Sequence, residues 1–266
     1  MAEREKRKAF RRRFLSVGSF IAVIFVWFVF TSWTTIIPPA FLPPPQYILA
    51  DFLRVIFSPY VGNTLIGHTV ASLEIVLGGF LLAIAVGIPL GILMGWFKRI
   101  EAIVDPLFQM LRPIPPLAWI PLSLLWFGIG IKSKIFVIWL AAFVPCVINS
   151  YTAIRLTDPL LVKAALGLGV KKQRDLLWEV AIPSSLPIIL AGVRIGLGAA
   201  WMTLVAAELL ASNAGLGYMM QMARRALEPS VIILCMLIIG ILGALMSRAL
   251  RSLERRICPW GNQEEH

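Results

Sequence analysis

Long apolar stretches separated by short charged intervals make up most of the chain. Five of them carry no Asp, Glu, Lys or Arg, and the sixth is interrupted by Arg194 alone. Because about 20 apolar residues cross a bilayer as a helix, each stretch predicts one crossing. The pattern therefore predicts an all-α integral membrane protein with six transmembrane helices. The stretches are 14–50, 75–97, 113–131, 135–154, 180–207 and 229–247.

The first stretch, 14–50, is long enough for two crossings, but its second half is rich in proline. Proline lacks a backbone N–H and cannot continue a helix. One helix followed by an extended external connection is therefore expected. The prolines are Pro38, Pro39, Pro43, Pro44 and Pro45.

A charged, amphipathic interval, Asp158 to Pro183, lies between two apolar stretches. Asp158 can cap a helix that starts at Pro159. Glycines at 167 and 169 can end that helix, and a second one is expected to stop at Pro183. The interval thus predicts two short helices joined at a glycine corner. Their apolar stripes are Leu160, Leu161, Ala164, Ala165 and Leu168, then Leu176, Leu177, Val180 and Ala181.

Lys and Arg fall mainly on one side of the predicted crossings. The amino-terminal arm, alternate loops and the carboxyl-terminal tail hold 19 of them, against five on the other side. The positive-inside rule then places both termini and the interval 158–183 in the cytoplasm. The formal net charge of +11 lies beside the membrane, where it meets lipid head groups, so we expect no nucleic-acid partner. The expected organisation is a basic arm (1–13), a transmembrane domain (14–250) and a cytoplasmic tail (251–266).

Residues for hydrolytic or metal chemistry are scarce. The chain has two His, no paired carboxylates and no GxxxxGK[ST] loop for phosphate, and its three Cys lack ligand spacing. We expect no catalytic, cofactor or metal site on this chain. Any ATP hydrolysis that drives it would take place on a separate chain.

Several segments, in order, are similar to one family of transport proteins. Ala164-Ala165, Gly169 and Ile182-Pro183 resemble the cytoplasmic coupling motif of bacterial ABC importer permeases, with Lys163 where the family usually has Glu. The likeness is strongest to the nitrate/sulfonate/taurine group, and especially to its taurine members. It extends through FLPPPQYILADF (Phe41 to Phe52), HTVASLEIVLGGF (His68 to Phe80), LRPIPPLAWIPLSLLWFGIG (Leu111 to Gly130), GVRIGLGAAWMTLVAAELLASNAGLGY (Gly192 to Tyr218) and Pro259-Trp260.

The resemblance implies a type I ABC importer permease fold in the bacterial inner membrane. It also implies a homodimer of this chain, two ATPase subunits that hold ATP and Mg, and an external substrate-binding protein. Taurine or another alkyl sulfonate is the expected substrate. Nitrate-like anions or another small organic molecule are the alternatives, and a stand-alone secondary carrier is a competing hypothesis.

Three sets of residues are candidates for function. The resemblance assigns contact with the ATPase to the interval 158–183. Prolines that break the third crossing could line the path or merely pack as a kink, and Arg194 could contact an anion or form a structural pair. The coupling set is Leu161, Ala164, Ala165, Leu168, Gly169 and Pro183; the path set is Arg194, Pro115, Pro116 and Trp119; the candidates for a gate or a structural ion pair are Glu74, Glu208 and Arg112.

Overall fold

The computed structural model describes residues 18–19, 21–33, 38–210 and 212–259, so the basic arm and the end of the tail lie outside it. Within these ranges the chain is helical, with no strand. Four helices are long and apolar enough to cross a membrane, and two shorter apolar ones occupy the first and third predicted crossings. The all-α prediction is confirmed. The four are α3 (Leu65–Trp96), α6 (Ile131–Arg155), the continuous helix Gln173–Leu210 and α11 (Pro229–Ile257); the two are Ile21–Trp33 and Pro116–Phe127.

The chain forms two compact units, one of residues up to Leu65 with Met219–Leu237 and the other of Ile66–Tyr218 with Ile238 onwards. The first unit contains a π-helical turn, η1 (Val29–Trp33), and the helix α2 (Pro45–Phe57). It also contains most of α10 (Leu216–Ala226) and the beginning of α11.

The extended connection is shorter than the prolines predicted, because it ends at Pro44. Pro38 to Pro44 lie outside any helix, but Pro45 is the first residue of α2. The prediction was wrong there because the first helical position needs no N–H donor and favours the fixed φ of proline.

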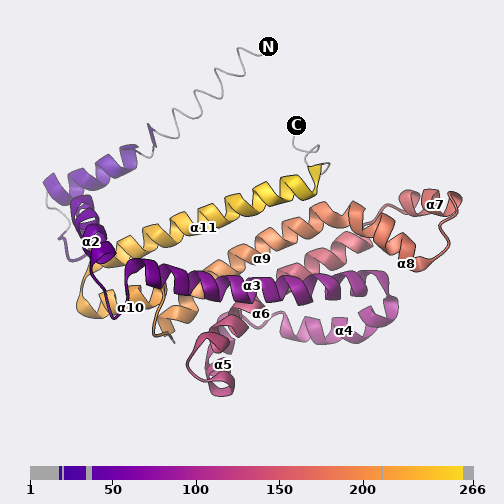
Figure 1. Ribbon diagram of the computed structural model, residues 1–266, viewed down its shortest axis with the longest axis horizontal. Helices are drawn as coiled ribbons and strands as arrows, with labels where there is room; N and C mark the ends of the chain where they lie inside the picture. The colour runs from indigo at the N-terminus through magenta and orange to yellow at the C-terminus, as the bar shows by residue number, and fades with distance from the viewer. Residues whose placement is uncertain (1–17, 20, 34–37, 211, 260–266) are drawn as a thin grey trace, which may run out of the picture. The chain divides into compact units, whose positions relative to one another are not determined.

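The second unit contains the remaining crossings. Figure 1 shows α3, α4, α6 and α9 running alongside one another, with α7 and α8 beyond one end. A buried cluster from α3, α6 and α9 forms the core, with Val76, Ile138 and Leu197 among its members. The further elements are α4 (Lys98–Leu111), η2 (Pro116–Trp119), α5 (Ile120–Phe127), α7 (Pro159–Gly167), α8 (Gln173–Leu176), η3 (Leu177–Ala181) and α9 (Ile182–Leu210).

Glycines let α3 and α9 approach α6 closely. A Cβ on Gly91 of α3 would lie 2.5 Å from the carbonyl oxygen of Val147. A Cβ on Gly192 of α9 would lie 2.3 Å from Cβ of Asn149. Neither position has room for a side chain, so these glycines set the helix spacing.

The helix expected to stop at Pro183 does not stop there. The chain continues from α8 through the π-helical turn η3 into α9. Ile182 N donates to the carbonyl of Leu177, five residues back. A π-turn widens the helix just before the proline ring, which accommodates a residue that an ideal α-helix would reject.

Candidate functional site

The helix α7 has defined caps at both ends. Asp158 Oδ1 accepts a hydrogen bond from Leu160 N at 2.8 Å, which confirms the predicted cap. At the other end, Gly169 has a φ of +98°. Its N–H donates to Leu166 O, and Val170 N donates to Ala165 O, both at 3.1 Å. This pair of bonds is a Schellman motif with glycine in the left-handed position, so the predicted corner lies at Gly169.

Much of the apolar surface of α7 and its corner is uncovered. Leu168 is 88% exposed, and Leu160 and Leu161 are exposed as well, whereas Ala165 is buried. Leu176 and Leu177, at the start of the helix after the corner, are buried. They hold that helix against the rest of the unit. The exposed leucines can bury apolar area only against another molecule.

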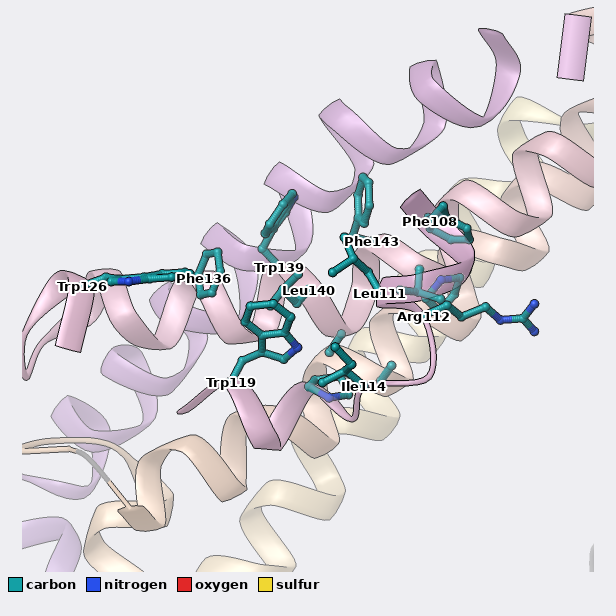
Figure 2. A pocket seen from close by; sticks show the side chains of 15 residues that line it. Phe108, Leu111, Arg112, Ile114, Trp119, Trp126, Phe136, Trp139, Leu140 and Phe143 are labelled. Atoms are coloured by element: carbon teal, nitrogen blue, oxygen red, sulfur yellow. The ribbon is translucent and has the colours of Figure 1, made fainter. Parts of the chain in front are cut away.

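A largely apolar cavity of about 500 Å³ lies between the end of α4, η2, α5 and α6. Figure 2 shows its aromatic side chains gathered along α6 and η2. Trp119 faces Phe136 edge-on, with ring centroids 6.4 Å apart, and Trp139 lies 5.1 Å from Phe143. Sequence reasoning found Pro116 and Trp119 but missed these rings of α6, since an aromatic residue in an apolar helix gives no sign of which way it faces.

The prolines before η2 place Trp119 in this cavity. The helix α4 ends at Leu111, and a new 3₁₀ turn starts only at Pro116, with Pro115 as its N-cap. Proline at both positions prevents one continuous helix. The break turns the chain so that Pro116 and Trp119 line the cavity.

Arg112 also lines the cavity, but its guanidinium group points away from the rings in Figure 2. A second cavity of about 200 Å³ is lined by Arg112 too, and it shares Phe108 with the first. Among the described residues Arg112 enters no ion pair.

Glu208, at the end of α9, is 1% exposed and is held by hydrogen bonds. Ser72 Oγ donates to its carboxylate at 2.8 Å, and Gly217 N donates to Oε2 at 2.8 Å. A Cβ on Gly215 would lie 2.2 Å from Oε1, so only glycine fits beside the carboxylate. Glu208 forms no direct ion pair in the described part of the chain. Its carboxylate instead caps the start of α10.

The segment 212–217 is fixed by buried side chains from α3 and α6 as well. This segment leads into α10, and each contact satisfies a polar group that burial would otherwise make costly. Sequence reasoning missed His68, Ser72 and Lys134 because their partners are far away along the chain. The bonds are Gly215 N to His68 Nδ1 at 3.1 Å, Leu216 N to Ser72 Oγ at 2.8 Å, and Lys134 Nζ to Ser212 Oγ at 2.8 Å.

Arg194 and Glu74 lie apart from the aromatic cavity. The Arg194 guanidinium forms an ion pair with Glu254 near the end of α11, and its side chain is 45% exposed. Glu254 lies beyond residue 250, where the transmembrane domain was expected to end. It is still part of a helix, because α11 continues to Ile257. Glu74 is exposed on α3. The structural pair envisaged for Arg194 is therefore present, with a partner in the segment expected to be a tail.

The first unit has its own polar cluster between α2 and the start of α11. Tyr60 Oη donates to Glu228 Oε2 at 2.8 Å, and Arg54 pairs with the same carboxylate at 3.3 Å. The pKa of Tyr60 is raised above its ordinary value, mainly because the phenol is partly buried and secondly because it donates to Glu228. The cluster fastens α2 in place.

Residues 87–258 match the family described as the inner membrane component of binding-protein-dependent transport systems. The chain belongs to this family of permeases. A Methanocaldococcus jannaschii protein named as an ABC transporter permease is 46% identical to this permease over 84% of this chain and 83% of its own. The taurine transport system permease of Escherichia coli K12 is 40% identical, over 92% and 89%. A Bacillus subtilis permease named for aliphatic sulfonates is 36% identical, over 99% and 95%.

A solved structure supports the fold. A chain of the inward-facing MetNI methionine ABC transporter superposes on the permease with a TM-score of 0.62. The superposition covers 80% of this chain and 98% of the MetNI chain, and the two sequences are 17% identical. The expected type I importer permease fold and the likeness to the sulfonate and taurine group are confirmed, and the permease is a multi-pass inner membrane protein.

The permease brings some of the predicted site residues together and separates others. Arg112, Pro116 and Trp119 line one cavity, with Pro115 next to them. Leu161, Ala164, Ala165, Leu168 and Gly169 belong to α7 and its corner, while Pro183 lies in the helix that follows. Arg194, Glu74 and Glu208 lie elsewhere. The roles of all these residues in transport stay predictions.

Proposed function

We propose that this chain is the permease subunit of an ATP-driven importer that moves a small organic anion across the inner membrane by alternating access. Two copies of the chain form the path, and two ATPase subunits bind on the cytoplasmic side with ATP and Mg. An external binding protein delivers the substrate. Both termini lie in the cytoplasm, as the distribution of Lys and Arg indicates.

The exposed apolar surface of α7 is the observation that supports coupling to an ATPase. Leu161 and Leu168 are uncovered, although the helix is short and capped at both ends. A capped helix is already folded, so it can transmit a movement of the ATPase to the membrane helices without first having to fold. The helix after the corner runs without interruption from Gln173 to Leu210, and Leu176 and Leu177 at its start are buried. Closure of the ATPases would therefore move α9 through this connection.

An alkyl sulfonate such as taurine is the proposed substrate, and nitrate-like anions are the alternative. The support is the likeness to permeases named for taurine and for aliphatic sulfonates. The aromatic cavity provides the proposed path, because it lies beside the broken third crossing and its volume of about 500 Å³ can hold a small molecule. A stand-alone secondary carrier would instead depend on buried ionisable residues such as Lys134 and Glu208, which do not contact each other directly.

Uptake in proteoliposomes tests the proposal. The chain is reconstituted with and without its co-expressed ATPase, with the binding protein and labelled taurine outside and ATP inside. We expect uptake only when the ATPase and ATP are both present. Uptake by the chain alone under an ion gradient would establish the secondary carrier instead.

A further inference from the structure

A polar cavity of about 200 Å³ lies between α3, α4 and α6, next to the aromatic cavity. It is the more polar of the two, with charged, amide and hydroxyl groups on its wall. Its size suits a small molecule with few heavy atoms. Its polar lining residues are Asp105, Gln109, Arg112, Tyr151 and Thr152.

Two opposite charges in this cavity have no ionic partner in the described chain. Glu101, one turn before Asp105, is already satisfied, because Arg155 pairs with it at 3.4 Å and Tyr151 Oη donates to it. Asp105 accepts a hydrogen bond only from Gln109, at 3.3 Å. Arg112 takes part in no ion pair. Asp105 is half-buried and Arg112 is exposed, so the cavity presents one carboxylate and one guanidinium that have water but no ionic partner from the described residues.

The helix geometry keeps these two charges on one face but apart. Asp105 and Arg112 are seven residues apart in α4 and its C-cap, which is two turns or about 10.5 Å along the axis. Their side chains do not pair directly. A small molecule that carries both a positive and a negative group can bridge them.

Phe108 separates this cavity from the aromatic one. Its side chain is buried, lines both cavities and packs edge-on against Phe143 with centroids 6.3 Å apart. Arg112 is the other residue that lines both the polar cavity and the aromatic cavity. The cavities are thus successive compartments along α4 and α6, with a ring and a cation at their boundary.

We propose that the polar cavity binds a small zwitterion, with its acid group on Arg112 and its ammonium group on Asp105. This inference rests on the proposed function. It narrows the substrate to small molecules that carry an ammonium group together with a sulfonate or a similar acid group. A simple anion of the same size gains the contact with Arg112 but meets the negative charge of Asp105, so it binds more weakly. Tyr151 and Thr152 contribute hydroxyl groups to the same wall.

Equilibrium binding to the permease and ATPase complex in nanodiscs, without the binding protein, tests the site. The probes are taurine and ethanesulfonate, which differ only in the amino group. We expect taurine to bind about two- to fivefold more tightly, the ratio that one added ion pair in a partly wet site gives. Asp105→Asn should remove this preference, and Arg112→Gln should weaken both probes. Lys132→Gln, at an exposed cation that lines neither cavity, is the matched control for the charge change and should leave both affinities as they are in the wild type.

Equal affinities of the wild-type complex for the two probes would overturn the zwitterion site. So would an unchanged preference in a folded Asp105→Asn complex, whose assembly with the ATPase is checked by gel filtration. ATP-dependent uptake by the wild type, measured separately with the binding protein, keeps this result distinct from a failure of the proposed function. If uptake is normal and the preference is absent, only the site is wrong.

Discussion

Replacing Gly169 by valine tests whether the corner of α7 couples the permease to its ATPase. Gly169 adopts a φ of +98°, and no atom lies within 4 Å of a Cβ added there. The substitution therefore creates no clash, and its whole effect comes from the backbone. A side chain in the left-handed region costs about 1–2 kcal/mol, and a β-branched one lies at the upper end.

The exposed corner lets the cost appear mainly on docking. In the free permease the strained turn can relax, because Gly169 and Leu168 are not packed against anything. The ATPase would have to restore the turn, so its affinity should fall by a factor of about 5–30, which is what about 1–2 kcal/mol gives. Gly169→Asn should lose less, since Asn tolerates the left-handed region.

Titration of the detergent-solubilised permease with its ATPase subunit measures this affinity. Gly167→Ala is the matched control, because Gly167 is the last residue of α7, has open space around it and is not in the left-handed region. It should bind the ATPase like the wild type, and substrate-stimulated ATP turnover should follow the same order. If Gly169→Val binds and turns over as well as Gly167→Ala, the corner does not carry the coupling.

Three further changes have effects that differ by position. Gly192→Ala should lower the melting temperature, since overpacking at a close helix contact costs about 1–3 kcal/mol, whereas Gly198→Ala on the same helix meets no atom and should be neutral or stabilising. Ser72→Ala removes one of the two groups that donate to the buried Glu208 carboxylate and leaves the buried Leu216 N–H without its partner, so it should cost about 2–3 kcal/mol of stability, more than Ser133→Ala, whose hydroxyl bonds only the carbonyl of Gly130 at the start of its own helix. Arg194→Gln should cost at most about 1 kcal/mol because the Arg194 side chain of the ion pair is 45% exposed, and transport per assembled complex should not change; a large loss of transport would support its role as a path residue.

The membrane crossings could be predicted because burial in lipid requires long apolar runs, whatever the helices pack against. The boundaries were harder to predict. The helix α3 begins ten residues before its apolar run, because His68 and Ser72 are polar but find buried partners. The helix through Pro183 continues because a π-turn precedes the proline. In the first case distant partners override the local preference, and in the second a local π-turn does.

The candidate site was only partly visible for the same reason. Prolines at 115 and 116 break a helix in any context, so the irregular third crossing could be predicted from composition. That Trp119 meets Phe136, and that Phe108 separates two cavities, depends on which faces of α4 and α6 come together. Periodicity in a helix that is apolar all round does not specify a face.

The sequence alone determined the class of protein, the corner at Gly169 and the absence of a phosphate-binding motif, since each depends on local composition or spacing. Tertiary structure alone decided the partners of the charges. It joined Glu208 to the start of α10, paired Arg194 with Glu254, and left Asp105 and Arg112 facing one cavity without a mutual contact. The physical reason is that a charge in or beside a membrane is governed by its neighbours in space, and those neighbours lie on helices far away in the chain.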